Sequence, residues 1–351
     1  MVLPALVQAA GGGDTGNVRA LVEGGVDVNE DCGEGKTALM FASHDGSLGI
    51  VVVLLAADAD ADQADNDGFT PLLISSENGH RAVVKLLLDK GATVDKANND
   101  GFTPLIMSSQ GGHHEVVKQL LDRGATLDKA SNKGDTPLIV SSQDGHQVVM
   151  TLLLHRGATV DQADNDGDTP LIVSGQNGHQ GAMELLLDGG ADVDLANNDG
   201  GTALIASSMF GHIEAVKLLL FRSAAVNQAA NDGGTPLIGA SFYGHYDIAK
   251  LLLKSGADVD HSMNDANTAL SLAGQKGHAA VASLLRHWSL TIPRRLAAYA
   301  LILHAIDLEE GRAVQEEAVS PLLQRLARTP DDIVRVIVLF VGDGGVQRRR
   351  S

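Results

Sequence analysis

The chain has 351 residues and a net charge of −18, from 44 acidic and 26 basic residues. An acidic chain of this kind repels phosphate backbones, so we expect no nucleic-acid partner and favour a protein partner with a basic surface. The chain is 44% hydrophobic but only 3% aromatic and contains 40 glycines, which indicates many short elements joined by tight turns.

The single cysteine, Cys32, excludes internal disulfides and metal sites built from cysteine pairs. The opening residues, MVLPALVQAAGGG, lack the basic start of a secretory signal. The longest apolar runs fall well short of the roughly 20 residues that a membrane-spanning helix needs. We therefore expect a soluble, monomeric intracellular protein without a membrane partner, in the cytoplasm or, alternatively, the nucleus.

The first predicted element, residues 1–36, is a degenerate copy of a repeat that runs through most of the chain. Within it, the P-loop-like ending Gly35-Lys36-Thr37 raises the possibility of nucleotide binding. A P-loop requires its first glycine at position 30, where this chain has Glu30, a carboxylate in the place of a phosphate-binding amide. Nucleotide binding at this stretch is therefore disfavoured, and we expect no cofactor.

Residues 37–288 are predicted to form eight further copies of a 33-residue repeat. A threonine marks each copy, a proline or alanine follows it, and a leucine comes next in every copy. Pro4 lies one period before Thr37, so the array has about nine copies. The eight threonines are Thr37, Thr70, Thr103, Thr136, Thr169, Thr202, Thr235 and Thr268.

Each copy predicts two short helices and a turn. The threonine caps a first helix that Gly112 and its equivalents end, and proline suits its first position. A second helix is expected to start at the following histidine and to carry runs such as VVKLLLDKG, with a left-handed cap at Gly91. Asp58 and Ser223 replace this capping glycine in two copies, and we expect the stack to fray or bend there.

The 33-residue period, the TPLI openings and the GH pairs between helices resemble the ankyrin repeat, over about residues 4–288. The resemblance implies an all-α fold, an α-solenoid of stacked helix-turn-helix repeats with β-hairpin turns, and protein binding through hairpin tips and the concave face. This chain departs from the family pattern in two ways. The histidine of TPLH is replaced by apolar residues, and the usual Ala-Ala pair is mostly Ser-Ser, whose hydroxyls can bond back to a carbonyl one turn earlier.

Other patterns that suggest chemistry fail at a required residue. A zinc-protease helix would need a second histidine where Lys118 stands, and a calcium loop would need a glutamate where Val173 stands. Weak cation binding at the acidic turns remains the alternative to a solvated hairpin. One histidine per copy, as at His80 and His113, lies too far from the next to share a metal, since stacked helices are about 8–10 Å apart. We expect no catalytic residue, no metal and no enzymatic activity.

Function is expected where the copies differ at exposed positions. The two residues before each GH pair are polar in most copies, but two adjacent copies carry Met and aromatic residues there. We expect these to form one apolar partner-binding patch, with packing between copies or against the C-terminal segment as the alternative. Phe69 and Phe102 at the hairpin tips are a second candidate, for which packing within the hairpin is the alternative. The patch comprises Met209, Phe210, Phe242, Tyr243 and Tyr246.

The negative charge lies in the repeats. Residues 289–351 contain nine arginines and eight acidic residues, so residues 1–288 have a net charge of −19. Carboxylates in the DNDG-type turns are expected to line one edge, where they could steer a basic partner or merely keep the array soluble.

Residues 289–351 do not continue the 33-residue repeat. They are predicted to form a helical cap on the last repeat, with a strand or a disordered tail as the alternatives.

The sequence thus predicts a non-enzymatic protein-interaction scaffold. The alternative is a regulatory or substrate-recruiting subunit of an enzyme complex, which would copurify with a catalytic partner in stoichiometric amounts.

Overall fold

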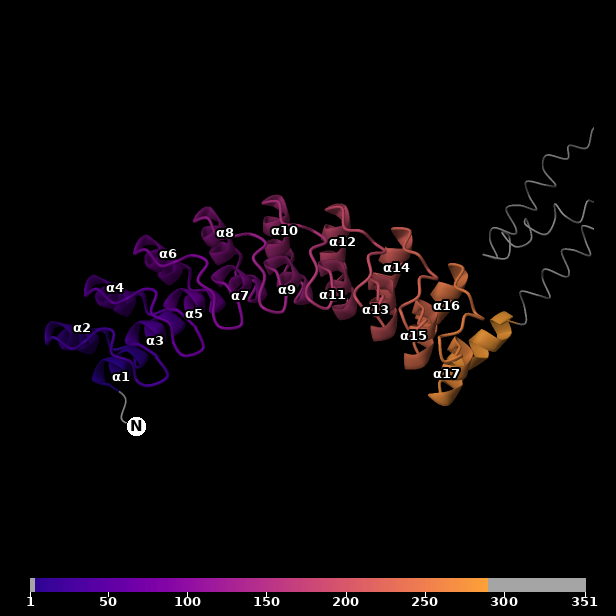
Figure 1. Ribbon diagram of the computed structural model, residues 1–351, viewed down its shortest axis with the longest axis horizontal. Coiled ribbons are helices and arrows are strands. Elements are labelled where there is room, and N and C mark those ends of the chain that lie inside the picture. Colours follow the sequence, from indigo (N-terminus) through magenta and orange to yellow (C-terminus); the bar gives the residue numbers. More distant parts are fainter. Residues whose placement is uncertain (1–3, 290–351) are drawn as a thin grey trace, which may run out of the picture. The chain divides into compact units, whose positions relative to one another are not determined.

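The computed structural model describes residues 4–289 of the chain. Within these residues it contains two compact units, one ending at Asn198 and the other starting at Asp199. Each unit is a stack of helix pairs joined by hairpin-like loops (Figure 1). The predicted all-α repeat architecture is confirmed in both units. The segment 290–351, for which a helical cap, a strand and a disordered tail were considered, lies outside the described residues.

In the first unit, six helix pairs follow one another along the chain, each first helix packing on the next first helix. The degenerate opening of the chain, from residue 4, supplies the first pair. The helices are α1 (Ala5–Gly11), α2 (Thr15–Glu23), α3 (Ala38–His44), α4 (Leu48–Ala56), α5 (Pro71–Glu77), α6 (Arg81–Asp89), α7 (Pro104–Gln110), α8 (His114–Asp122), α9 (Pro137–Gln143), α10 (Gln147–His155), α11 (Pro170–Asn177) and α12 (Gln180–Asp188).

In the second unit, the first helices of three repeats pack in order, and a final helix starts at residue 279 and reaches 289, the last described residue. The helices with both ends described are α13 (Ala203–Phe210), α14 (Ile213–Phe221), α15 (Pro236–Tyr243), α16 (Tyr246–Lys254) and α17 (Ala269–Gln275).

Each first helix begins as the sequence predicts. Thr70 is extended, with φ −100° and ψ 163°, and its hydroxyl accepts a hydrogen bond from the Leu73 backbone N–H at 3.2 Å. Pro71 follows at the first helical position, where its missing N–H costs nothing. The same cap recurs from Thr37 to Thr268. The repeated threonine is therefore a structural residue, including the one at the end of the P-loop-like stretch.

The second helices start one residue later than predicted. In α6 the histidine, His80, is the cap residue rather than the first helical residue, and its side chain makes no capping bond. The loops between repeats form few sheet contacts, since the described residues contain only two isolated antiparallel bridges, between Asp31 and Thr37 and between Ser262 and Thr268. The expected β-hairpins are thus hairpin-shaped loops with little strand pairing.

The core of each unit is a column of aliphatic side chains between helices. Leu72, Leu73 and Leu87 have no exposed surface, and equivalent leucines and isoleucines recur in neighbouring repeats. Because a single helix pair cannot cover these side chains alone, each repeat depends on its neighbours for burial.

The Ser-Ser pairs are buried, and their two hydroxyls behave differently. The first, as in Ser75, donates to the carbonyl of Leu72 at 3.2 Å, which confirms the predicted bond back to the preceding turn. The second is fully buried and has no partner among the described residues in Ser76 and Ser109, whereas in Ser142 it donates to the Leu138 carbonyl at 2.6 Å. Leaving a buried hydroxyl unpaired costs stability. The second serine of these two repeats therefore lowers their stability, and the repeats stay folded despite that cost.

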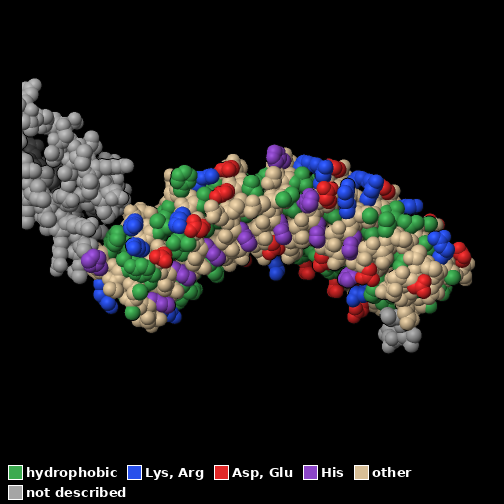
Figure 2. Space-filling view, turned by 180° about the vertical axis from the view of Figure 1, so that it is seen from behind, with side chains coloured by type: hydrophobic (Ala, Val, Ile, Leu, Met, Phe, Trp, Pro, Cys, Tyr) green, Lys and Arg blue, Asp and Glu red, His purple; other side chains and the backbone are tan. Residues whose placement is uncertain are grey.

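Histidine and glycine form the joint between successive repeats. The ring of His113 lies against Gly79 of the repeat before it, where a Cβ atom would come within 2.5 Å of the ring Nδ1. Its Nε2 bonds to the backbone carbonyl of Glu77 at 2.8 Å. The same bond recurs at His80, His146, His245 and His278, which confirms the structural role predicted for this row. Figure 2 shows the histidines (purple) reaching the surface at regular intervals.

Asparagines at the loop tips form a second joint that the sequence analysis did not identify. The side chain of Asn99 donates to the carbonyl of Asn66 at 2.9 Å, and its backbone N–H donates to the carbonyl of Asp67 at 2.9 Å. Asn132 and Asn165 repeat the side-chain bond to the preceding asparagine. The recurrence of asparagine every 33 residues is the signal that could have revealed this ladder.

Candidate functional site

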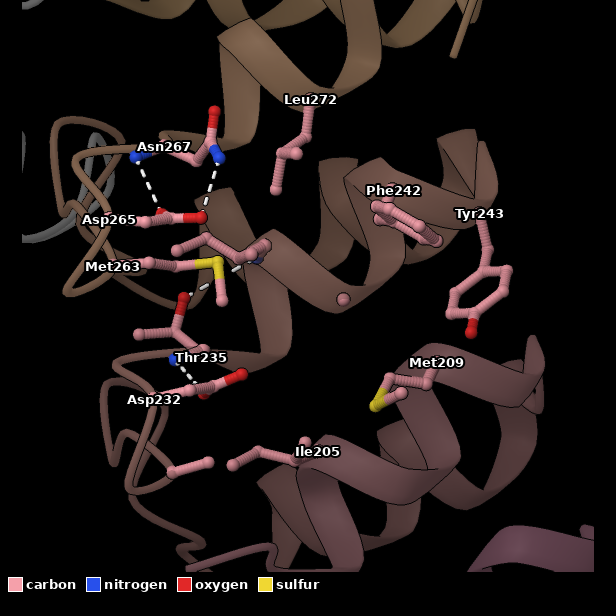
Figure 3. Close-up of a pocket in the computed structure, with 14 residues that line it drawn as sticks. Ile205, Met209, Asp232, Thr235, Phe242, Tyr243, Met263, Asp265, Asn267 and Leu272 are labelled. Carbon is pink, nitrogen blue, oxygen red and sulfur yellow. Dashed lines mark hydrogen bonds between the residues drawn. The ribbon is translucent and has the colours of Figure 1, made fainter. Parts of the chain in front are cut away.

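A groove in the second unit is the candidate site, with a volume of about 450 Å³. It opens between α13, α15 and α17 on one side and the loops before α15 and α17 on the other (Figure 3). Volumes of 300–1,000 Å³ are usual for ligand-binding clefts. Residues that line it are Ile205, Met209, Ala230, Asp232, Gly234, Thr235, Ile238, Gly239, Phe242, Tyr243, Met263, Asp265, Asn267 and Leu272.

Gly239 allows Met209 to pack closely against α15 in the wall of the groove. The equivalent position carries Ile74, Met107 or Val140 in repeats of the first unit. A Cβ at Gly239 would lie 2.6 Å from Cγ of Met209, so the methionine side chain lies over the glycine. Met209 therefore takes part of the space that a side chain at position 239 would need, and it forms part of the groove wall.

The helix side of the groove is apolar. Phe242 and Tyr243 contact each other edge to face, with ring centroids 4.9 Å apart, and both rings lie across the groove from Met263 in Figure 3. Tyr243 is 49% exposed, and Met209 and Phe242 are half-buried. The ammonium of Lys276 lies 4.4 Å from the centre of the Phe242 ring, a cation–π contact at the groove rim.

The loop side of the groove is acidic. Asp232 accepts the Gly234 backbone N–H at 2.7 Å. Asp265 accepts the backbone N–H of Asn267 at 3.0 Å and its side-chain amide at 2.8 Å. These bonds, the backbone one first, hold the pKa of Asp265 below its usual range, so the carboxylate is charged at neutral pH. Both aspartates are exposed.

Of the residues predicted to bind a partner, three meet in the groove: Met209, Phe242 and Tyr243. Phe210 and Tyr246 are 53% and 39% exposed but do not line it. The predicted patch is therefore divided between a groove and its surroundings.

Phe69 and Phe102 belong to the first unit and are half-buried at the ends of their loops. Their backbone N–H groups donate to Asp65 Oδ1 at 2.8 Å and to Asn98 Oδ1 at 2.9 Å. Their partner-binding role stays a prediction, beside the alternative of packing within the hairpin.

Sequence reasoning included Asp232 only as one of the carboxylates of the hairpin turns, and it missed Asp265 and Gly239. Gly239 could have been found by aligning the repeats, because it is the one glycine at a position that is otherwise apolar and mostly large. Met263 and Leu272 gave no such signal, because only the fold brings them to the same groove. Among residues 4–289, no three His, Cys, Asp or Glu side chains cluster closely enough to hold a metal ion. No helix in that range has the length and hydropathy of a membrane span.

Comparison with known proteins settles the family. A family model described as ankyrin repeats in three copies matches residues 6–98, 93–164, 152–230, 182–263 and 223–293. The chain belongs to the ankyrin-repeat family. Ankyrin repeats are generally protein-interaction modules and are typically not enzymes, so the groove lies in a fold suited to binding proteins.

Among solved structures, the ankyrin repeat domain of human ASB11 is similar to this chain, with 26% sequence identity and a TM-score of 0.58. The match covers 63% of this chain and 98% of that domain. No curated protein matched the chain.

Proposed function

We propose that this ankyrin-repeat protein is a non-enzymatic scaffold that holds a partner protein in the groove of its second unit. The observation that carries the proposal is the exposed apolar surface of Met209, Phe242 and Tyr243 around a hollow. Methionine and aromatic residues are enriched at protein interfaces, and burial of such side chains in a well-packed centre supplies most of the binding free energy. The cytoplasm is the proposed compartment, because the chain has only Cys32 and so cannot form an internal disulfide.

The test compares a groove variant with a matched control. The groove variant carries Met209→Gln, Phe242→Gln and Tyr243→Asn. The control carries Phe221→Gln on α14, because Phe221 is 82% exposed and does not line the groove. Both are compared with the native chain by affinity capture from cytosolic lysate and quantitative mass spectrometry, after circular dichroism and urea unfolding have shown that each variant folds.

We expect a set of proteins to be captured by the native chain and by the control but lost from the groove variant. Direct binding of the purified partner should then weaken at least tenfold in the groove variant, as for the loss of central interface residues. Equal capture by all three chains would refute the groove as the binding site. A catalytic protein recovered in stoichiometric amounts would instead identify the chain as a regulatory or recruiting subunit.

A further inference from the structure

We infer that the groove takes an extended segment of its partner in which a large apolar side chain lies between two basic side chains about three residues apart. This inference rests on the proposed function, and it adds the chemistry of the bound segment.

The apolar side chain is required by the helix side of the groove. Met209, Phe242 and Leu272 present carbon and sulfur atoms to the groove. Water in such a hollow has few polar partners, so its replacement by an apolar side chain is favourable. An aromatic or leucine side chain of the partner would pack against these atoms.

The basic side chains are required by the loop side. Asp232 and Asp265 are exposed carboxylates fixed in direction by bonds from their own loops, and such bonds leave further oxygen lone pairs free to accept. The segments 223–249 and 255–275 contain no lysine or arginine that could neutralise them. The imidazole of His261, which lies between the two in the sequence, bonds to the Gly233 carbonyl at 3.1 Å. A lysine or arginine of the partner would supply the missing charge.

The position of Lys276 determines which side of the groove binds the basic side chains of the partner. Its ammonium lies over the Phe242 ring, so the protein's own cation already occupies the helix-side rim. A basic side chain of the partner entering there would meet a like charge, whereas on the loop side it meets the carboxylates of Asp232 and Asp265. The bound segment therefore lies with its cations toward Asp232 and Asp265.

The spacing of the cations follows from the repeat. Asp232 and Asp265 occupy the same position in adjacent repeats, 33 residues apart. Stacked helices of adjacent repeats are about 8–10 Å apart. A segment in the extended polyproline II conformation has three residues per turn and rises about 3.1 Å per residue, so side chains three residues apart lie on the same side and about 9 Å from each other. One extended segment can thus place a basic residue at each aspartate and an apolar residue between them.

The experiment is a selection of random linear peptides displayed on phage against three immobilised full-length chains. These are the native chain, a Met209→Gln/Phe242→Gln variant and an Asp232→Asn/Asp265→Asn variant. The asparagine oxygens can still accept the backbone N–H groups of Gly234 and Asn267, and only the exposed bond from the Asn267 side-chain amide to Asp265 is lost, so the second variant mainly changes charge. We expect the native chain to enrich peptides with two Lys or Arg residues three apart around an aromatic or Leu residue. Both variants should lose them.

The best enriched peptide is then synthesised and titrated by fluorescence anisotropy. Each single substitution, Asp232→Asn or Asp265→Asn, should weaken binding about two- to fivefold, the range for exposed ion pairs. Asp247→Asn is the control, because Asp247 is an exposed carboxylate on α16 outside the groove, and it should leave the affinity unchanged. Raising the ionic strength should weaken the native complex more than the complex of the doubly substituted chain.

The outcomes separate this inference from the proposed function. Enriched peptides that lack basic residues, yet require Met209 and Phe242, would overturn the inference and leave the groove as a protein-binding site. Peptides bound equally by the Met209→Gln/Phe242→Gln variant, or no enrichment on the native chain, would overturn both. If that variant fails to fold, the Asp232→Asn/Asp265→Asn comparison still decides the inference.

Discussion

Asp58 and Ser223 hold a left-handed backbone that glycine holds in the other repeats. Their φ angles are 63° and 67°, where Gly91 and Gly124 have 91° and 85°. An L-residue in this conformation is strained by about 1–2 kcal/mol, although aspartate tolerates it better than most residues. The expected fraying at these two sites stays a prediction, and the strain now gives it a cause.

Replacing either residue by glycine should stabilise the protein. Asp58→Gly and Ser223→Gly are each expected to raise the free energy of unfolding by about 0.5–1 kcal/mol, the relief of strain less the added entropy of the unfolded chain. Urea unfolding followed by circular dichroism measures this. Gly91→Ser is the reverse control, because a Cβ there meets nothing within 4 Å and only backbone strain is added. Hydrogen exchange that is equally slow around both sites and around Gly91 would contradict the predicted fraying.

Asp192 interrupts a row of side-chain contacts between repeats. In the row, Thr126 donates its backbone N–H at 3.1 Å and its hydroxyl at 2.5 Å to Asp95, and Thr93 and Thr159 bond in the same way to Asp62 and Asp128. Asp192 occupies the threonine position opposite Asp161. Only its backbone N–H bonds there, at 3.1 Å, and Asp161 Oδ1 has no partner among the described residues.

Restoring the threonine should therefore stabilise the first unit. Asp192→Thr removes a negative charge from a residue bonded to Asp161 and adds a hydroxyl donor to the Asp161 carboxylate, for an expected gain of about 1 kcal/mol in the free energy of unfolding. The bond that Asp192 accepts from the Asp194 N–H is lost, but it lies at an exposed turn. The opposite change, Thr126→Asp, should cost a similar amount in the same urea titration. A loss of stability in Asp192→Thr would show that the row contributes nothing.

At the scale of elements, the joint between repeats requires glycine for two separate reasons. Gly79 has a φ of 72°, and it also makes room for the His113 ring. Gly91 has a positive φ but open space around it. The two glycines therefore allow backbone strain to be separated from the contact between repeats.

Gly79→Ala should cost about 2 kcal/mol more than Gly91→Ala. The added methyl displaces the His113 ring and breaks its bond to the Glu77 carbonyl, whereas Gly91→Ala adds backbone strain alone. A double-mutant cycle with His113→Ala checks the cause, because the extra cost of Gly79→Ala should largely disappear once the ring is absent. Additive effects would place the cost outside the joint.

The helix pairs could be predicted because their determinants are local. Thr70, Pro71 and Gly91 act within a few residues of themselves, through capping, a fixed φ and a left-handed turn. The ring of His113 and the tip asparagine Asn99 act on the preceding repeat, so only the fold reveals their partners. The groove is the extreme case. Met209 and Phe242 stood out in the sequence as breaks in the pattern, but Met263 and Asp265 join them through packing across repeats.

At the scale of the whole molecule, the repeats carry far more negative than positive charge, a net −19 up to residue 288. Ion pairs between repeats, such as Arg156 with Asp122 at 2.7 Å, offset only a part of it. A chain with this excess repels itself, and the folded state, being more compact, suffers more than the unfolded state.

Salt should therefore stabilise the protein. Raising sodium chloride from about 0.02 M to about 0.5 M shortens the screening length to a few ångströms and should raise the urea midpoint. Potassium chloride should give the same shift, since screening depends on ionic strength and not on the cation. A urea midpoint that falls as salt is added would mean that the ion pairs between repeats outweigh the repulsion between like charges.

The asparagine ladder has a consequence for how the gene can change. Asn99 is a donor to the repeat before it and an acceptor for the repeat after it. Every loop tip in this part of the stack therefore offers the same donor on one side and the same acceptor on the other. An unequal exchange that removed residues 100–132 would join Asn99 to Lys133 and bring together ends that already match. We expect such a deletion to fold with an unchanged circular dichroism signal per residue, and a collapse of that signal would disprove it. The array can then gain or lose whole 33-residue repeats during evolution. The groove cannot be restored in this way, because its residues differ from those at the same positions of the other repeats.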